Sequence, residues 1–376
     1  MRKPYICFFG TYDRNFTSNK LILDGLKALD IPVLEVNYEI KVTRLDKKED
    51  LSWVKLLKRI VVKYGIIRAI IKNWKNIKKT DAIYVGYPGH FDVLIAWPVA
   101  KLLQKKLVFN PLVVFYTGFT EEQGILKKES LMGRVSKFGE SLVYNLCDIV
   151  FADTPLQETF LTSVLNVKKE KIRVLPIGAD DKYYHYTPYT NLSKKINVTY
   201  YGLYSPIHGV DHIIKAANLL KNDHDIEFVF VGNGQTFERN YQLAQKLELK
   251  NCTFYFDTPL DQHPAIIAKA DIFFGFLEKH PSVDRIIPNK IYQGMALNKV
   301  VFTADAPVVR SLFAHKENMY FCNPADPNAL AQSLTELKDN PQLRKRIAEN
   351  GYALFKKEFT PSQVCKKLIK YIDEIL

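Results

Sequence analysis

The chain alternates short apolar runs with stretches of helical periodicity along its whole length, and this alternation constrains the fold more than any other feature. In the first half the apolar runs are YICFFG, IPVLEVNY, DAIYVGY, KLVFNPLVVFY, DIVFADT and IRVLPIG. Apolar runs bounded by Gly, Pro or Asp and separated by amphipathic helices are typical of parallel strands that helices cover on both faces. The sequence therefore predicts an α/β fold.

The series starts again after residue 195, with INVTYYG, IEFVFVGNG, CTFYFD, DIFFGFL, VVFTAD and NMYFCN as expected strands. Two such series in a chain of 376 residues predict two Rossmann-like parallel-sheet domains that face one another across a cleft. We expect these domains at 1–180 and 195–360. The segment 179–195 between them is polar and contains proline, as an interdomain linker does.

The chain is basic, with 53 Lys and Arg against 40 Asp and Glu and a formal net charge of +13. Such a field favours an anionic partner, which could be nucleic acid, acidic lipid or a phosphorylated small molecule. The basic residues concentrate in 41–79, where their neighbours are aliphatic rather than stacking side chains, and no nucleic-acid recognition module is recognisable. We therefore expect no nucleic-acid partner.

The segment 51–79 has the pattern of a basic amphipathic helix. Its apolar residues recur at helical spacing, at Trp53, Leu56, Leu57, Ile60 and Val61, and Lys or Arg fills the other face. No acidic residue lies between Asp50 and Asp81. A helix of this kind lies on an anionic membrane surface. The alternative is a solvated helix that packs on the sheet.

Several features bear on the compartment. The five cysteines are widely spaced and form no C-x-x-C pair, which favours a reducing compartment and argues against a disulfide framework. The apolar run at the N-terminus breaks at Gly10 and is too short for a signal peptide. The nearly uncharged stretch 82–100 contains Gly and Pro, so we interpret it as strand, loop and helix start rather than a membrane span. We expect a cytoplasmic protein, peripheral on the inner face of the membrane.

Three motifs follow strands of the second domain. They are G-L-Y-S-P-I-H-G at 202–209, V-G-N-G-Q at 231–235, and the stretch 284–307, which carries Arg285 and Lys290. Glycines allow a ligand to approach the backbone, and the free N–H groups of a helix start attract phosphate. The two cations could neutralise a diphosphate. Because the carboxyl ends of parallel strands meet at one edge, we expect the three motifs to form one site for a phosphorylated ligand.

A metal site is not expected. His208 and His212 have the i, i+4 spacing of metal ligands, with Asp211 between them. Gly209 interrupts that turn, and no third ligand is apparent in the sequence.

With these motifs identified, the sequence resembles the retaining GT-B glycosyltransferases of glycosyltransferase family four. The matching stretches of the second domain are YYGLYSPIHGVDHIIKAA, FVFVGNG, ADIFFGF, IPNKIYQGMALNKVVFTADAP, NPADPNALA and GYALFKKEFT. FFGTYDRN and LPIGAD match in the first domain. The resemblance covers 195–360 closely and the first domain loosely.

The resemblance implies a nucleotide-sugar donor on the second domain, a glycan or lipid-linked acceptor on the first, and transfer with retention of anomeric configuration. It implies no divalent metal and no cofactor, because the leaving phosphate itself accepts the proton of the acceptor. It also implies that a last helix, 361–376, crosses back onto the first domain.

The expected site residues fall into three groups. We assign catalysis to His90, Arg285 and Lys290. We assign donor binding to Gly10, Thr11, Gly202, Tyr204, Ser205, His208, Gly209, Gly232, Asn233, Gly234, Pro288, Asn289 and Gln293. We assign the acceptor side to Asp13, Arg14, Thr117, Gly118 and Glu121, which follow strands of the first domain. For His90 the alternative is a histidine whose ring a neighbouring group satisfies inside the fold.

The chain departs from the family pattern at two places. The usual Arg and Lys of the first glycine turn are replaced around Tyr204 and His208, and the usual pair of glutamates eight positions apart becomes Arg285 and Gln293. A GT-B sugar-nucleotide epimerase, or a nucleotide-binding homologue without catalysis, is therefore the alternative function.

Overall fold

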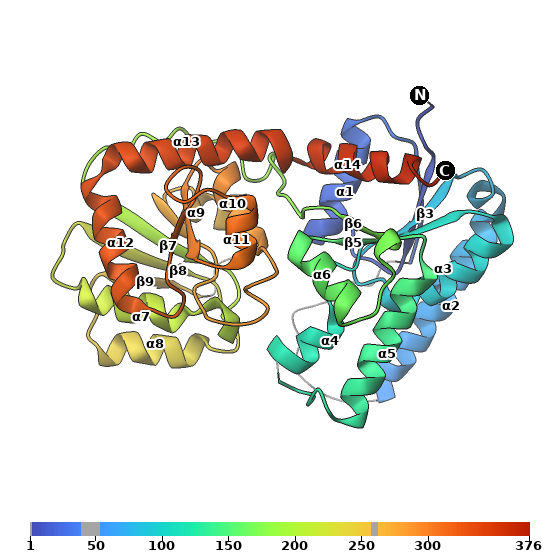
Figure 1. Ribbon diagram of the computed structural model, residues 1–376, viewed down its shortest axis with the longest axis horizontal. Coiled ribbons are helices and arrows are strands. Elements are labelled where there is room, and N and C mark those ends of the chain that lie inside the picture. Colours follow the sequence, from blue (N-terminus) through green and yellow to red (C-terminus); the bar gives the residue numbers. More distant parts are fainter. Residues whose placement is uncertain (1, 39–52, 123, 257–261) are drawn as a thin grey trace. The chain divides into compact units, whose positions relative to one another are not determined.

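The computed structural model describes residues 2–38, 53–122, 124–256 and 262–376, with the backbone alone for 53–64, 263 and 264. The chain divides into two compact units, which we call unit 1 (1–177 and 361–376) and unit 2 (178–360). In each unit helices lie on both faces of one parallel sheet (Figure 1). The predicted α/β class with two Rossmann-like domains is therefore confirmed.

Sheet A of unit 1 has six parallel strands in the order β2-β1-β3-β4-β5-β6. Their bounds are β1 (Ile6–Gly10), β2 (Val33–Asn37), β3 (Ala82–Val85), β4 (Lys106–Phe109), β5 (Ile149–Ala152) and β6 (Ile172–Val174). Phe8 in β1 pairs with Glu35 of β2 on one side and with Tyr84 of β3 on the other. All six strands therefore end at the same edge, where open sheets of this kind bind ligands.

Helices cover both faces of sheet A. Their bounds are α1 (Thr17–Ala28), α2 (Trp53–Ile77), α3 (His90–Leu103), α4 (Phe115–Thr117), α5 (Leu131–Leu146), α6 (Pro155–Ser163) and α14 (Pro361–Asp373). Alternate side chains of a strand point to opposite faces. Cys7 and Phe9 accordingly pack with α2, α3, α5 and α6, whereas Ile6 and Phe8 pack with α1 and α14. The last helix thus completes the core of unit 1.

Sheet B of unit 2 has six parallel strands in the order β12-β11-β10-β7-β8-β9. Their bounds are β7 (Ile196–Tyr201), β8 (Ile226–Val231), β9 (Cys252–Tyr255), β10 (Ile272–Phe274), β11 (Val300–Ala304) and β12 (Tyr320–Cys322). Its helices are α7 (Val210–Leu219), α8 (Phe237–Lys246), α9 (His263–Ile267), α10 (Asn289–Ala296), α11 (Pro307–Leu312), α12 (Pro327–Asp339) and α13 (Pro341–Glu358). Gly294 lets α10 lie directly on sheet B, because a Cβ there would be 2.9 Å from Val301 and 3.0 Å from Phe273.

The segment expected to be a linker, 179–195, belongs to unit 2 and is packed against it. Arg344 of α13 is fully buried and holds this segment through its guanidinium. It donates to the Tyr189 hydroxyl (2.9 Å) and to the carbonyls of Asn191 (3.3 Å) and Ser193 (2.5 Å). Its Nη1 also donates to the Leu337 carbonyl at the end of α12 (2.5 Å). A buried charge therefore joins the first residues of unit 2 to its last helices.

One expected strand is shorter than the sequence pattern suggested. The run KLVFNPLVVFY was expected to be a single strand, but β4 ends at Phe109. Pro111 has no N–H to donate to a sheet, and Leu112 has a φ of +59°, so the chain turns there. The residues from Phe115 then form the short helix α4.

The described half of α2 packs on sheet A through Ile66, Ile70 and Ile77, while Ile67 and Ile71 remain exposed. The side chains of Trp53, Leu56, Leu57, Ile60 and Val61, which suggested a membrane helix, lie outside the described residues. No helix in the described part of the chain has the length and apolar character needed to span a bilayer.

We expect Arg344→Ala to destabilise unit 2 by about 3 kcal/mol, because it leaves several buried carbonyls unpaired and opens a cavity. The measurement is the free energy of unfolding in urea. Arg346→Ala, on an exposed position of the same helix, is the matched control and should change stability by about 0.5 kcal/mol or less. Equal effects of the two substitutions would contradict the role assigned to Arg344.

Candidate functional site

Two glycine turns, 202–209 after β7 and 231–235 after β8, meet at the carboxyl edge of sheet B. The N–H of Gly202 donates to the carbonyl of Val231 (3.0 Å). A Cβ on Gly232 would lie 2.1 Å from the oxygen of Gly202, so the backbones could not approach with any other residue there. Two of the three motifs found in the sequence therefore form one continuous backbone surface.

The predicted donor residues Tyr204, Asn233 and Gly234 lie at this junction. The N–H of Tyr204 donates to the carbonyl of Asn233 (3.1 Å), and a Cβ on Gly234 would lie 2.6 Å from the Tyr204 nitrogen. The ring of Tyr204 is buried and packs edge-on against Tyr200. Ser205 lies one residue further on, where its carbonyl accepts from the N–H of His208 (3.0 Å). The buried ring of Tyr204 thus anchors the turn in the core of unit 2, whereas the backbone of Asn233 and Gly234 lies at the surface of the turn.

Lys290 of α10 points at the first turn. Its side chain is buried, its Nζ lies over the ring of Tyr200 at 4.2 Å from the centroid, and a Cβ on Gly202 would be 3.3 Å from that Nζ. Among the described residues its partners are the Tyr200 ring and Nδ1 of His208 at 3.5 Å, and neither is a carboxylate. Burial lowers the pKa of Lys290 to about 7. The third motif therefore supplies a buried cation without a counter-charge beside the glycine turns.

His208 lies next to this cation. Its Nδ1 is 2.6 Å from the hydroxyl of Tyr200 and 3.5 Å from Nζ of Lys290. Burial, together with the charge of Lys290, lowers the pKa of His208 well below its usual value. The imidazole is therefore neutral at pH 7, and its contact with Tyr200 fixes the position of the turn that ends at Gly209.

The other residues predicted from the third motif are arranged differently. The guanidinium of Arg285 donates to the carbonyl of Pro281 (3.1 Å) and to the hydroxyl of Ser282 (3.3 Å) within its own loop. Pro288 and Asn289 are half-buried at the start of α10, and Gln293 is buried one turn further on. The structure thus brings Lys290 to the glycine turns, whereas Arg285 donates hydrogen bonds to its own loop.

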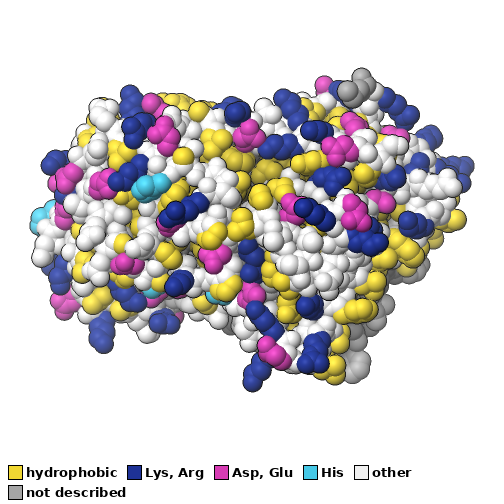
Figure 2. All heavy atoms as spheres, viewed as in Figure 1, with side chains coloured by type: hydrophobic (Ala, Val, Ile, Leu, Met, Phe, Trp, Pro, Cys, Tyr) yellow, Lys and Arg dark blue, Asp and Glu magenta, His cyan; other side chains and the backbone are white. Residues whose placement is uncertain are grey.

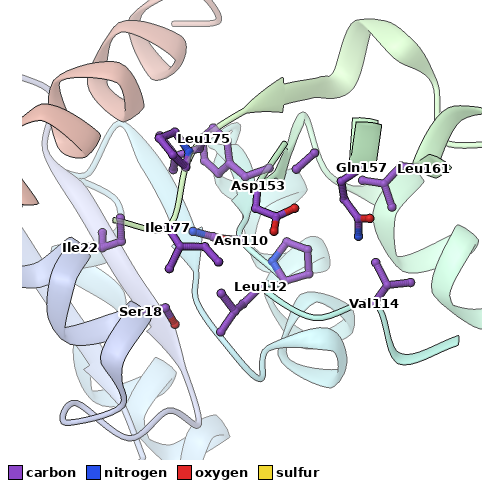
Figure 3. Close-up of a pocket in the computed structure, with 14 residues that line it drawn as sticks. Ser18, Ile22, Asn110, Leu112, Val114, Asp153, Gln157, Leu161, Leu175 and Ile177 are labelled. Carbon is purple, nitrogen blue, oxygen red and sulfur yellow. The ribbon is translucent and has the colours of Figure 1, made fainter. Parts of the chain in front are cut away.

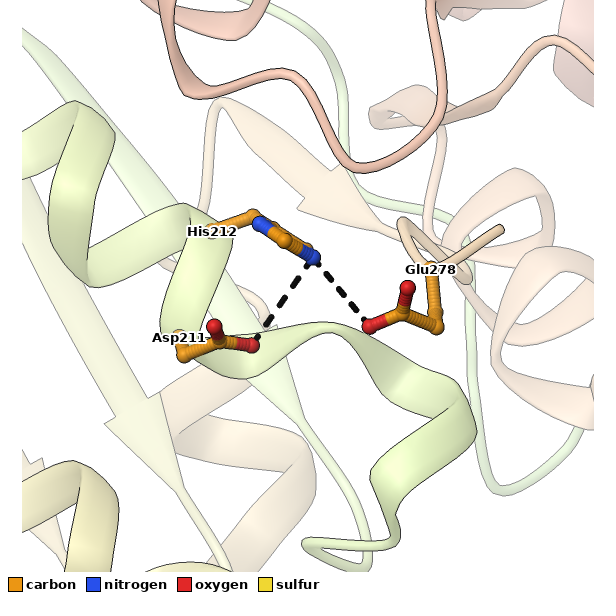
Figure 4. Close-up of side chains that lie close together, drawn as sticks. All are labelled: Asp211, His212 and Glu278. Carbon is orange, nitrogen blue, oxygen red and sulfur yellow. Dashed lines mark hydrogen bonds and ion pairs between the residues drawn. The ribbon is translucent and has the colours of Figure 1, made fainter. Parts of the chain in front are cut away.

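Asp211, His212 and Glu278 lie close together beside these turns (Figure 4). The Nε2 of His212 is 3.1 Å from a carboxylate oxygen of Glu278 and 3.9 Å from one of Asp211. Lys215 already pairs with Asp211 at 2.7 Å. His208 and His212 face different partners, so they do not form the paired ligands that their spacing suggested. We interpret the group as an ion-paired cluster that holds the loop after β10 to α7.

The chain contains a D-x-D triplet that our sequence analysis overlooked, Asp223-His224-Asp225. It precedes β8, at the opposite edge of sheet B from the glycine turns. Lys338 pairs with Asp223 at 2.6 Å and holds the pKa of that carboxyl below its usual value against the opposing effect of burial. The triplet therefore lies away from the candidate site.

In unit 1 the predicted residues Gly10 and Thr11 end β1. The N–H and the hydroxyl of Thr11 both donate to the carboxylate of Asp92, at 2.8 Å and 3.0 Å. A Cβ on Gly10 would lie 2.6 Å from that carboxylate. Burial raises the pKa of Asp92, although the bonds from Thr11 oppose the shift. Sequence analysis missed Asp92, which fixes the first turn of unit 1.

His90 is buried rather than presented at the edge of the sheet. Its Nε2 lies 3.1 Å from Glu140 and 3.3 Å from the Tyr144 hydroxyl, and its ring stacks on Phe115. Glu140 also accepts from the N–H groups of Phe115 (2.8 Å) and Tyr116 (2.7 Å). Nε2 of His90 is thus satisfied inside the fold, as the alternative interpretation expected, whereas Nδ1 is buried without a hydrogen-bond partner in the described part of the chain.

The predicted acceptor residues have partners within unit 1. Arg14 pairs with Glu35 at 2.9 Å, and Glu121 pairs with Lys128 at 2.7 Å. The carboxylate of Asp13 accepts from the N–H of Asn15 (2.8 Å). The Thr117 hydroxyl donates to the Val114 carbonyl, and no atom lies within 4 Å of a Cβ built on Gly118. These residues do not form one cluster, but open space remains beside Gly118.

A pocket that sequence analysis did not predict lies at the carboxyl edge of sheet A (Figure 3). It is narrow, with a volume of about 20 Å³, and is lined by the residues that follow β4, β5 and β6, among them Asn110, Asp153 and Ile177. Ser18 and Gln157, both buried, also line it, and Ser18 Oγ and Gln157 Oε1 have no hydrogen-bond partner in the described part of the chain. Buried polar atoms are seldom left unpaired. The pocket therefore suits a hydroxyl-bearing group.

Comparison with solved structures identifies the class of this fold. The chain is similar to Anabaena HepE, solved in complex with UDP-glucose, with a TM-score of 0.69 and 16% identity over 99% of this chain and 100% of that one. It is also similar to a sucrose-phosphate synthase of Thermosynechococcus elongatus, with a TM-score of 0.70 and 12% identity over 99% of each chain. The fold is GT-B, as the resemblance in the sequence implied.

Comparison of the sequence identifies the family domain. Residues 188–354, which form most of unit 2, match the family described as glycosyl transferases group 1. An uncharacterised glycosyltransferase of Methanocaldococcus jannaschii is 24% identical over 174 residues, which are 46% of this chain and 47% of that protein. The chain therefore spans about half the length of that curated relative.

The lowered pKa of Lys290 predicts how stability depends on pH. The unfolded chain holds this proton up to its ordinary pKa of 10.5, whereas the folded chain loses it above about 7. The free energy of unfolding should therefore rise with pH between about 7 and 10.5, and this group alone should contribute about 1.4 kcal/mol per pH unit. The measurement is the difference in unfolding free energy between wild type and Lys290→Met from pH 7 to 9.5. Parallel pH curves would contradict the assignment.

Proposed function

We propose that the protein transfers a sugar from a nucleoside-diphosphate sugar, and that unit 2 binds this donor. The observation that carries the proposal is the buried, unpaired ammonium of Lys290 beside two glycine turns. An uncompensated buried charge is costly, and an anion between the turns would remove that cost. Since the similar HepE was solved with UDP and with UDP-glucose, we propose a UDP-sugar as the donor.

The chemistry follows from the group that leaves. When the bond between the anomeric carbon and the phosphate oxygen breaks, negative charge collects on the diphosphate. A donor group already in place stabilises that charge without reorganisation. The approaching anion raises the pKa of Lys290 and keeps the ammonium form. We propose retention of configuration without a metal, with a phosphate oxygen taking the proton of the acceptor hydroxyl.

We further propose that unit 1 binds the acceptor, a glycan or lipid-linked sugar. The pocket lined by Ser18 and Gln157 supports this, because its two unpaired polar atoms can bond to sugar hydroxyls. The basic segment 51–79 supports a location on an anionic membrane, where a lipid-linked acceptor would be available. A cytoplasmic enzyme peripheral on the inner face of the membrane is the proposal that unites these features.

Thermal-shift titration with UDP tests donor binding. At one hundred times the dissociation constant, UDP should stabilise the wild type by about 2.7 kcal/mol. Lys290→Met should weaken UDP binding by about 2 kcal/mol, roughly 30-fold, because it removes a charge-assisted hydrogen bond. Lys279→Met removes the same charge from an exposed position in the loop after β10 and should bind UDP as the wild type does.

The products of turnover distinguish a transferase from an epimerase and from a non-catalytic homologue. A transferase releases UDP from the UDP-sugar faster when acceptor is present, and the product keeps the anomeric configuration of the donor. An epimerase would convert one UDP-sugar into another without releasing UDP. Binding of UDP without either reaction would identify a non-catalytic homologue, and no binding of any nucleoside diphosphate would refute the donor site itself.

A further inference from the structure

Helix α5 of unit 1 carries an apolar stripe on its outer surface. Leu131, Val135, Phe138 and Leu142 are spaced four, three and four residues apart, which places them on one face of the helix. All four are exposed, Leu131 by 77% and Phe138 by 70%. A helix in a soluble fold normally turns such a face to the core, yet here the buried positions of α5 are on its opposite side, at Val143 and Tyr144 for example.

The neighbouring helix α3 repeats the arrangement. Phe91, Leu94, Trp97 and Leu102 are exposed, while Val93 and Ala96 face sheet A. The two helices lie side by side, because His90 at the start of α3 contacts Glu140 and Tyr144 of α5. We call the exposed apolar residues of the two helices the apolar face. The exposed apolar residues of α3 thus lie on a helix adjacent to the stripe of α5, and grouped exposed apolar residues on a soluble protein mark an interaction surface.

The charges around the apolar face are mostly positive, with the exposed Glu129 just before α5 as an exception. Helices α2, α3 and α5 contain Asp92 and Glu140 as their acidic residues, and both carboxylates are buried. Arg134 and Lys137 of α5 and Lys101 of α3 lie beside the exposed apolar residues in sequence. The described half of α2, on the same face of sheet A, adds further exposed basic residues at Arg68, Lys72 and Lys75. Figure 2 shows hydrophobic and basic side chains intermixed over this part of unit 1.

We propose that the apolar face docks on the surface of an anionic lipid bilayer, with Leu131 and Phe138 entering the boundary between head groups and acyl chains. Apolar side chains at helical spacing with Lys and Arg beside them match the two layers of such a surface. The apolar residues differ from those of the basic segment 51–79, which contributes only the surrounding charges Arg68, Lys72 and Lys75, and the inference does not depend on glycosyl transfer.

Charge distinguishes a bilayer from a protein partner. A second copy of this chain would bring the same basic residues against Arg134 and Lys137, and like charges would oppose the contact. An anionic bilayer supplies counter-charges over its whole surface and an apolar layer beneath them. An anionic bilayer therefore matches both the apolar residues of the apolar face and the basic residues beside them.

Sedimentation with sucrose-loaded vesicles tests the proposal on the full chain. Wild type should bind vesicles of equal phosphatidylglycerol and phosphatidylcholine, and bind pure phosphatidylcholine more weakly. The double variant Leu131→Ser/Phe138→Ser should lower the partition coefficient about 100-fold, or about tenfold for each apolar side chain that no longer enters the lipid. Arg134→Gln/Lys137→Gln should weaken binding to the anionic vesicles alone and reduce its sensitivity to salt.

The matched control is Leu219→Ser/Phe256→Ser, which removes the same two residue types from exposed positions of unit 2 and should leave vesicle binding unchanged. All variants are first checked for an unchanged unfolding midpoint. Vesicle binding by Leu131→Ser/Phe138→Ser equal to that of wild type would overturn the proposal. So would a wild-type dimer that dissociates in this variant and binds no vesicles, because a second copy would then cover the apolar face.

Failure of this proposal and failure of the donor site are distinguishable, since UDP stabilisation and vesicle binding are measured separately. Loss of vesicle binding with an intact UDP response is the result expected of the double variant. A wild-type protein that responds to UDP and ignores anionic vesicles would refute the docking surface alone.

Discussion

The carboxyl edge of sheet B is organised around one positive charge that has no negative partner. Lys290 is held inside unit 2 by α10, over the ring of Tyr200, where water cannot solvate its ammonium. Desolvation of this kind favours the neutral amine, unless an anion arrives to share the site. The glycine turns leave their backbone uncovered beside it, and His208 remains neutral so that it does not add a second charge. The proposed binding of a diphosphate would supply the negative partner that this buried ammonium lacks.

Much of the architecture could be predicted because parallel strands buried on both faces need continuous apolar runs, and the chain has them at regular intervals. The glycine turns and Lys290 could be predicted for a related reason, since strand ends in such sheets share one edge. The packing of 179–195 on unit 2 could not be predicted, because the segment is polar and composition does not show that Arg344, some 150 residues later, satisfies its carbonyls. Asp92 and Glu140 were missed because a carboxylate in a helix usually signals a solvated surface, whereas here backbone N–H groups and Thr11 surround them.

The apolar face of unit 1 shows a limit of periodicity. Leu131, Val135, Phe138 and Leu142 have the spacing of a buried helix face, so the sequence alone places them in the core. Helical spacing reveals that apolar residues share a side, but only packing reveals which side meets the sheet. In α5 the small residue Gly133 and the polar residue Glu140 face inward, and the large apolar ones face out. The proposed docking on a bilayer would give these exposed apolar residues a partner.

The position of α14 has a consequence for the order in which the protein forms during synthesis. Val364, Leu368 and Ile372 fill one face of sheet A together with α1, although every strand of that sheet precedes residue 175. The ribosome must therefore make all of unit 2 before the first unit can close its core. During that interval one side of sheet A exposes its apolar side chains to solvent or to chaperones, and unit 2 has the opportunity to fold first even though its sequence comes second.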